Sequence, residues 1–451
     1  MTAGDRKFSV VQTATGRFLH VVGSLPPSFH GVRSGDGYDC PLDAQNAAAI
    51  RRELPWSAPQ RVGLRKSIGC GDRLGIATPG HLRAVREGDM FPVLAQQSMR
   101  EMARARRTPQ DVLDDATWGV IQADYRDGFG CDGDHLKSRE DIDACVEAGY
   151  LGFTLDPGEY VDDEADQADR AALERKLAAL PWDRLRTDLA ANRAFYVEEQ
   201  GLSEPDYLRA VAKYGRALAH VADLATHIVS RMGGQGFDLE ISVDETATVT
   251  SLAEHRYIAL ELKRLGVPFT GLSPRFVGEF EKGVDYIGDL AAFEESYRQH
   301  AALAKELGPY KLSIHSGSDK FSIYPIIARY SNPYVHLKTS GTSWVEALRV
   351  VAQQDPALFR QILALAIAGY PQNRASYIVS GDPARIPANL SDAELPSLLD
   401  QFDAREVLHV SFGPVLARYR DEIYAILYAS QETYWSILHA HFNRHIQPFK
   451  G

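Results

Sequence analysis

Carboxylate and imidazole side chains stand at several points of this sequence where an apolar run, typical of a buried strand, comes to an end. The first group is Asp132, Asp134 and His135 in the stretch GCDGDHLKS. Imidazole nitrogen and carboxylate oxygen are ligands for a divalent metal, and a neighbouring carboxylate that does not bind the metal can move protons. The alternative is an Asx turn in which Asp134 caps the helix that follows.

A second group lies in the stretch FDLEISVDET. Glu240 stands inside an otherwise apolar strand, where an ionised carboxylate is costly unless it is paired. Because side chains alternate along a strand, Glu240, Ser242 and Asp244 would share one face and could all look into the interior of the fold. Asp244 could equally cap the helix that follows.

Two later strand ends carry polar side chains as well. His315 ends the apolar run YKLSI and suits a metal ligand, although a lone histidine at a strand end is often a structural hydrogen-bonding residue. In VHLKTSGTSW, His336 and Lys338 share a strand face, and Thr339 and Ser340 begin a turn into a helix. Free N–H groups at such a turn could bind a carboxylate or phosphate, and ordinary helix capping would explain the same residues.

The stretch GLSPRFVGEFEKGVDY is a long loop after a strand, rich in charged residues. One of its acids could complete a set of two histidines and a carboxylate together with His135 and His315. The spacing does not decide between Glu279 and Glu281. Arg275 could hold a carboxylate of the substrate through two parallel hydrogen bonds.

Short apolar runs alternate with stretches of helical spacing, as in a parallel sheet covered by helices. The strand candidates are residues 61–69, 91–96, 129–134, 149–156, 237–244, 267–273, 310–316, 334–338 and 407–412. A parallel β/α barrel has eight strands, so one of these nine candidates is an edge piece or a misread segment. The pattern predicts an α/β fold of the (β/α)8 TIM-barrel type, in which catalytic groups sit at the carboxyl ends of the strands.

Three segments fall outside this alternation. Residues 1–60 contain two stretches rich in proline and glycine and predict an N-terminal extension or cap, which leaves 61–451 for the barrel. Residues 157–236 open with an acidic run and then become almost wholly helical, and 369–406 are rich in proline, serine and aspartate. Both predict insertions that could cover the mouth of the barrel, although an acidic run is often only a solvated helix start.

The composition excludes several classes of protein. A formal net charge of −11 over 451 residues disfavours nucleic acid and anionic membranes as partners. No apolar window is long enough for a membrane helix and the start lacks a signal peptide, so we expect a cytoplasmic protein. The four cysteines have no disulfide or zinc-ribbon spacing. Serine-hydrolase, P-loop and dinucleotide motifs are absent, and the histidines of the segment YWSILHAHFNRHI are interpreted as packing or surface residues.

Long stretches between about residues 70 and 345 resemble the tagaturonate epimerase family. They are GDRLGIATPGHLRAV, AQQSMREM, DDATWGVIQAD, DGDHLKS, EISVDET, RFVGEFEKGVDYIGDL, SIHSGSDKFSIYP and HLKTSGTSW. The resemblance implies interconversion of D-tagaturonate and D-fructuronate in hexuronate breakdown, with a divalent metal and no nucleotide. The order and length of these stretches make them more specific than any single short motif.

The same resemblance implies roles for individual residues. It favours His135 and His315 as metal ligands, with an acid in 279–281, taken as Glu281, as the third ligand. It favours Asp134 and Glu240 as the pair that transfers protons. The candidates for contact with the sugar acid are Arg275, Lys338, Thr339, Ser340 and His336.

The implied reaction restricts the mechanism, because the carbon that is epimerised is β to the ketone and its C–H is not acidified by that carbonyl. A retro-aldol cleavage avoids the difficulty: a base removes the proton of the β-hydroxyl, the C–C bond breaks, and the aldehyde turns before it rejoins. Temporary oxidation would need a hydride acceptor, for which the sequence shows no dinucleotide fingerprint.

Other readings of the same residues stay open. The chain could be a class II aldolase, or a ketose isomerase or 4-epimerase, that acts on a related sugar acid or a free ketohexose. It could also be a sugar-acid-binding protein without activity, which the same fold permits. Mixed histidine and carboxylate ligation suits zinc, manganese, iron, cobalt or nickel. A homo-oligomer is possible, and the sequence does not determine it.

Overall fold

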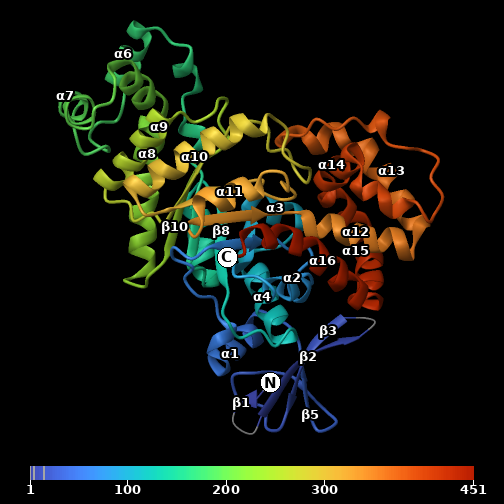
Figure 1. Cartoon of the computed structure of the whole chain (residues 1–451). Coiled ribbons are helices and arrows are strands. Elements are labelled where there is room, and N and C mark those ends of the chain that lie inside the picture. Colours follow the sequence, from blue (N-terminus) through green and yellow to red (C-terminus); the bar gives the residue numbers. More distant parts are fainter. Residues whose placement is uncertain (1, 4–5, 14–15) are drawn as a thin grey trace.

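Eight parallel strands close into a barrel in the computed structural model, which describes residues 2–3, 6–13 and 16–451 (Figure 1). Around the barrel the strands are β6 (Ser67–Cys70), β7 (Phe91–Ser98), β8 (Gly130–Leu136), β9 (Gly152–Leu155), β10 (Asp238–Val243), β11 (Gly271–Pro274), β12 (Lys311–Ile314) and β13 (Val335–Thr339). Each pairs in parallel with the next, and β13 pairs with β6. The predicted (β/α)8 barrel is confirmed.

The ninth strand candidate, residues 407–412, was wrong. It lies in the helix α14 (Phe402–Val410) and at the start of α15 (Phe412–Ala429). Every residue from Asp403 to Val410 is buried, charged ones included, so this helix has no exposed face. A short apolar run of this kind cannot be told from a buried strand by its pattern alone.

Helices surround the barrel. They include α2 (Thr78–Val85), α3 (Met99–Ala105), α4 (Pro109–Gln122), α5 (Arg139–Ala148), α8 (Glu204–Met232), α9 (Leu252–Arg264), α10 (Leu290–Leu307), α11 (Tyr324–Ser331) and α12 (Thr342–Gln354). The chain then continues through α13 (Pro356–Asn373), α14, α15 and α16 (Gln431–Ile446). The helix α16 returns to pack against α2 and α12, so the end of the chain lies against the barrel.

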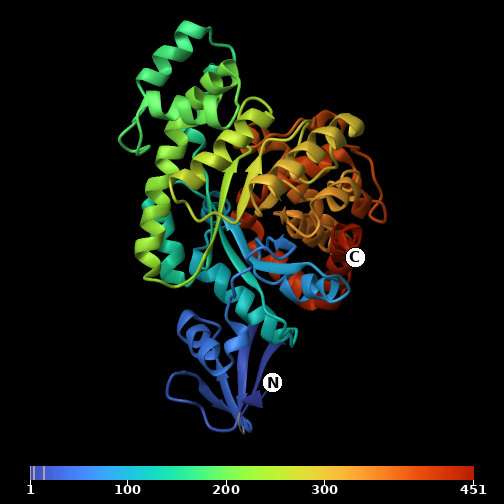
Figure 2. The same cartoon turned by 60° about the vertical axis from the view of Figure 1, so that its left-hand side comes forward.

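The N-terminal extension forms a small sheet of its own in the order β1-β2-β3-β5-β4. Its strands are β1 (Thr2–Ala3), β2 (Arg6–Thr13), β3 (Gly16–Val22), β4 (Val32–Ser34) and β5 (Gly37–Cys40), followed by α1 (Ala44–Glu53). Phe8, Leu19 and Ile50 pack there with Trp118 and Ile121 of α4. The extension therefore sits on an outer helix of the barrel, and it projects to one end of the molecule (Figures 1 and 2).

The segment 157–236 is mostly helical. It contains α6 (Arg170–Ala178), α7 (Leu189–Arg193) and the long helix α8, which packs between α5 and α9 as the barrel helix that leads to β10. The helices α6 and α7 lie at the opposite end of the molecule from the N-terminal sheet (Figure 2). The segment 374–401 contains only short 3-10 turns between α13 and α14.

None of the helices in the described part of the chain combines the length and the apolar character that crossing a membrane requires. The four cysteines are buried free thiols.

Candidate active site

A single buried ammonium group on β13 connects this strand to β8, β9 and β10 at the carboxyl end of the barrel. Lys338 on β13 is only 3% exposed, and its Nζ donates to Asp132 at 2.8 Å and to Asp134 at 2.7 Å, both on β8. It also donates to Thr154 at 2.7 Å and lies 3.0 Å from Glu240 Oε1 on β10. Strand alternation places these groups on one face, as the sequence predicted for Glu240 and for Lys338.

The ammonium controls the charge of these acids. Burial raises the pKa of a carboxyl, but at two of them the charges of Lys338 and of the nearby histidines together outweigh burial. The pKa of Asp134 is lowered, and that of Glu240 is held well below its usual range. The pKa of Asp132 stays raised, because burial and the neighbouring carboxylates outweigh Lys338 there. Two ionised acids therefore face the interior of the barrel.

His315 lies between two carboxylates. Its Nε2 is 2.6 Å from Glu240 Oε1, and its Nδ1 is 3.1 Å from Asp244 Oδ1. Ser242 donates to Asp244 from the same face of β10. Burial alone would lower the pKa of His315, but these two carboxylates raise it to about 10. The three residues Glu240, Ser242 and Asp244 thus share one face, as predicted, and together they hold the imidazole.

A bulge turns His135 toward the same place. The pairing of β8 with β9 shifts register between Gly133 and Leu136, and His135 has a left-handed φ of 53°. A bulge redirects side chains, so Asp134 and His135 can reach the same site although they are adjacent. His135 Nδ1 lies 3.2 Å from Asp156, and its ring centroid is 5.1 Å from that of His315. A strained conformation of this kind often marks a functional site.

These side chains offer the ligand types of a divalent metal ion, which would have to displace Glu240 Oε1 from its position 2.6 Å from His315 Nε2. One ligand atom each of Asp134, His135 and His315 lies within 4.8 Å of the others. The Nδ1 atoms of the two imidazoles face the carboxylates of Asp156 and Asp244. A carboxylate on the second ring nitrogen is the usual way to orient a histidine that binds metal through the first.

A cavity of about 330 Å³ opens beside this group. Asp244, His315 and Ser316 form its inner wall, and Arg275 lies on the wall contributed by the loop after β11. Residues 375–378, from the segment that the sequence predicted as a loop-rich insertion, form another part of the wall. A cavity of this size is in the range of small-molecule sites.

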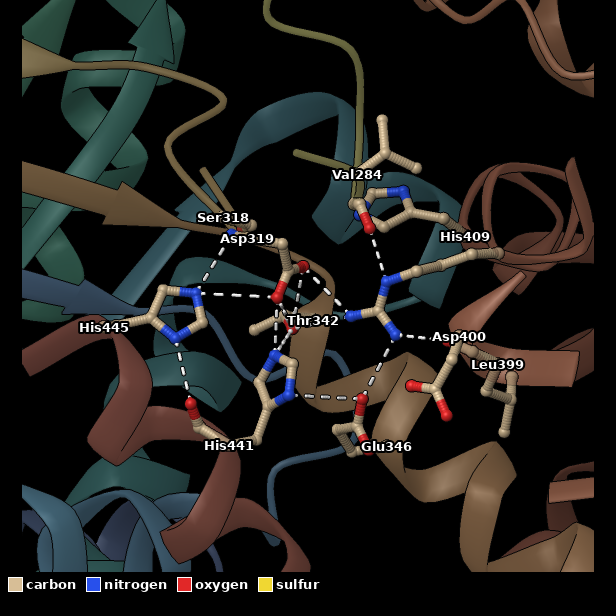
Figure 3. Close-up of polar contacts among 12 residues, drawn as sticks. Val284, Ser318, Asp319, Thr342, Glu346, Leu399, Asp400, His409, His441 and His445 are labelled. Carbon is tan, nitrogen blue, oxygen red and sulfur yellow. Dashed lines mark hydrogen bonds and ion pairs between the residues drawn. The ribbon is translucent and has the colours of Figure 1, made fainter. Parts of the chain in front are cut away.

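A second buried group of possible ligands contains Asp319, His441 and His445 (Figure 3). Its donor atoms are used within the protein: the Asp319 amide donates to His445 Nε2 at 3.0 Å, and Arg405 donates to the Asp319 carboxylate at 3.0 Å. His441 Nε2 lies 2.6 Å from the same carboxylate. We interpret the cluster as a structural one that ties α16 and α14 to the loop after β12.

A model of the tagaturonate epimerase family matches residues 5–449 of this sequence. The tagaturonate/fructuronate epimerase of Thermotoga maritima is 38% identical over 455 aligned residues, which cover 98% of this chain and 94% of that protein. The chain belongs to the tagaturonate epimerase family. Like the other members it is an enzyme of the epimerase type, an isomerase, as the sequence led us to expect.

Solved structures agree with this assignment to the tagaturonate epimerase family. The glycerol-complexed crystal structure of the fructuronate-tagaturonate epimerase UxaE from Cohnella laeviribosi superposes with a TM-score of 0.93 at 35% identity. The alignment covers 100% of this chain and 95% of that one. The native crystal structure of the same protein gives a TM-score of 0.92 with the same coverage.

Several residues that the sequence singled out lie elsewhere in this family member. The Glu281 carboxylate accepts from the Ser380 hydroxyl at 2.7 Å and is not in the group with the two histidines, and Glu279 is exposed beside Arg275. The Ser340 hydroxyl donates to Glu101. The geometry therefore gives no support to Glu281 as a metal ligand, and that role stays a prediction.

The remaining predicted substrate contacts are buried. The Thr339 hydroxyl donates to the carbonyl of Gly69 at 2.5 Å. His336 Nδ1 lies 2.9 Å from Ser67 Oγ, and burial lowers its pKa to about 3. Lys338 is used by carboxylates of the protein. None of these three is among the described residues that line the cavity.

Sequence reasoning missed Asp156. It follows the apolar run of the strand candidate 149–156 and holds His135, as described above. The rule that selected the other groups, a polar residue that closes an apolar strand run, would have found it.

Proposed function

We propose that this epimerase interconverts D-tagaturonate and D-fructuronate, the activity for which its relatives are named. The observation that carries the proposal is the group of two imidazoles and ionised carboxylates at the carboxyl end of the barrel, in a chain that matches the family along almost its whole length. The cavity beside this group is polar on its inner wall, as a sugar acid requires.

We propose further that the reaction depends on a divalent metal, held by His135, His315 and a carboxylate. Asp134 is the carboxylate that lies with the two imidazoles, so we give it the ligand role that the sequence suggested for Glu281. When bound, the ion would act as a Lewis acid that polarises the ketone of the substrate and stabilises negative charge on its oxygens.

The protein side chains would then move the protons of a retro-aldol cycle. Glu240, ionised and close to His315, takes the proton of the hydroxyl on the reacting carbon. The bond between C3 and C4 breaks, which leaves an aldehyde at C4 and an enediolate of three carbons. The aldehyde turns, C3 attacks its other face, and the new alkoxide takes up a proton. Asp134 would serve the opposite face through Oδ2, the oxygen that accepts from Gln96 at 3.2 Å and not from Lys338.

The second candidate is a class II aldolase, or a ketose isomerase or 4-epimerase acting on a free ketohexose, because the same metal and base would serve these reactions. Product analysis separates them. An aldolase releases products with three carbons, and a ketose isomerase releases an aldose.

The experiment is metal removal and restoration. The protein is treated with a chelator, single divalent ions are restored, and D-tagaturonate is followed by chromatography that resolves D-fructuronate from smaller products. His315→Ala and Glu240→Gln are assayed alongside, with D-fructuronate and D-tagatose as further substrates. We expect D-fructuronate to form only with metal and its formation to fall at least about 100-fold in both variants.

Full activity in the chelated protein would contradict the metal-dependent mechanism. A second run in D2O tests the retro-aldol step. We expect no deuterium at C4 of the product, because the C4–H bond never breaks in this cycle. Deuterium at C4 would indicate direct proton abstraction instead.

A further inference from the structure

Three cationic side chains line the cavity, and one of them differs from the other two. Arg100 lies 3.6 Å from Glu245, and Arg275 lies 3.6 Å from Glu279. Lys282 donates from Nζ to the Ser316 hydroxyl at 2.6 Å, and no carboxylate among the described residues lies within 4.0 Å of it. A half-buried ammonium with no carboxylate in contact attracts one.

We propose that Lys282 binds the carboxylate of the substrate and selects sugar acids over neutral ketohexoses. This inference rests on the proposed function and deepens it. Neither the composition nor the spacing of the sequence separated Lys282 from the other charged residues of its loop. The contacts described above separate it, because Arg275 and Arg100 each already have an acid beside them.

Two buried cationic side chains hydrogen-bond to the backbone on both sides of Lys282. The buried Lys320 donates to the carbonyl of Glu281 at 2.7 Å and also to that of Val284. The guanidinium of Arg405 donates to the carbonyl of Gly283, which has a left-handed φ of 74°. The residues before and after Lys282 are thus anchored to buried cations, so its side chain is presented from a rigid segment. Rigid presentation lowers the entropic cost of binding.

The Lys282 ammonium lies in the same cavity as His315, where it can bind the carboxylate of a substrate. Ser316, which accepts its hydrogen bond, directly follows His315 and has a left-handed φ of 47°. The left-handed backbone at Ser316 brings this hydroxyl into contact with Lys282, one residue after the imidazole in the chain. In a hexuronate the carboxylate carbon lies two bonds beyond the reacting C4, and it stays on the aldehyde fragment after cleavage. Lys282 would therefore hold the fragment that must turn and keep it from leaving.

A hydrogen bond to a charged group supports a preference of about 10- to 100-fold for a charged over a neutral substrate. The test uses the metal-restored enzyme and five proteins: wild type, Lys282→Met, Lys282→Arg, Arg275→Met and Lys305→Met. Lys305 is an exposed lysine on α10 and serves as the matched control for charge. Both kcat and KM are measured for D-tagaturonate and for D-tagatose, with equilibrium binding by calorimetry.

We expect Lys282→Met to lose about 10- to 100-fold in kcat/KM for D-tagaturonate, mainly through KM, and to change little for D-tagatose. Lys282→Arg should recover most of the loss, and Lys305→Met should behave as wild type. An equal loss for both sugars would overturn the proposal, since it would indicate a structural role. So would a selective loss in Arg275→Met with none in Lys282→Met.

Calorimetry distinguishes a failure of this inference from a failure of the proposed function. If wild type turns over neither sugar, the proposed function fails, and Lys282 is then judged on binding alone. Binding of D-tagaturonate that weakens at least about 10-fold in Lys282→Met, with binding of D-tagatose unchanged, supports the inference. Equal binding of D-tagaturonate by wild type and variant refutes it.

Discussion

Replacement of Lys338 by methionine tests the charge arrangement at the centre of the barrel. Methionine keeps most of the length of the side chain but leaves Asp132, Asp134 and Glu240 without their shared ammonium. Removing one partner of a buried ion pair costs about 3–5 kcal/mol, and three acids depend on this cation, so we expect about 5 kcal/mol. At roughly 2.1 cal/mol/K per residue, a chain of 451 residues loses about 5 °C in Tm.

The assay is thermal unfolding of chelated protein, with the exposed Lys305→Met as control. The pKa values of Asp134 and Glu240 are lowered in the folded protein, so their contribution to stability is present at pH 7 and is lost as the pH falls. The deficit of Lys338→Met should therefore be full at pH 7 and shrink below about pH 4. A change in Tm under about 1 °C at pH 7 would refute the reasoning.

Three further changes test the surroundings of the site. Asp156→Asn weakens the hold on His135, and we expect the metal to bind about 10- to 100-fold less tightly by calorimetry, with Tm of the chelated protein little changed. Asp319→Asn removes one of the two carboxylates that pair with the buried Arg405 and should cost about 3–5 kcal/mol in urea denaturation; a neutral result would contradict the ionised cluster. Burial and the neighbouring Glu281 raise the pKa of Glu406 to about 8. Between about pH 4.5 and 8 the folded state therefore holds a proton that the unfolded state has released. The free energy of unfolding falls as the pH rises through this range. Glu406→Gln should remove this dependence of the free energy of unfolding on pH and should be more stable than wild type at pH 8 by about 1–3 kcal/mol. An unchanged pH dependence would contradict the raised pKa of Glu406.

Much of the site followed from strand alternation and from the polar residues that close apolar runs. These rules place Glu240, Ser242 and Asp244 on one face and His315 at a strand end, as the structure has them. They could not show the bulge at His135, because no residue type in GCDGDHLKS announces a register shift. Without it, adjacent side chains on a strand point to opposite faces.

The roles of the loop residues could not be predicted, because they depend on contacts between distant segments. Glu281 was selected for its acid group, yet that group is used by Ser380, about one hundred residues away in the chain. Lys338 was selected as an anion binder, yet the anions it binds belong to the protein. A related limit explains the false strand at 407–412, because a short apolar run buried in a helix cannot be told from a buried strand by its pattern alone.

In this barrel the strands carry the groups proposed for the reaction, and the loops carry the group proposed to select the substrate. The groups proposed to carry the reaction stand on β8 and β10 or directly after β12, where sheet pairing fixes them. Lys282, the proposed determinant of substrate choice, stands on the loop after β11, which is anchored by the buried Lys320 and by Arg405 of the cluster around Asp319. A change in the loop after β11 should therefore alter which sugar is accepted before it abolishes the reaction. A change at a strand end should do the reverse, because the proposed metal ligands and the proposed proton-transfer groups would be displaced for every substrate alike.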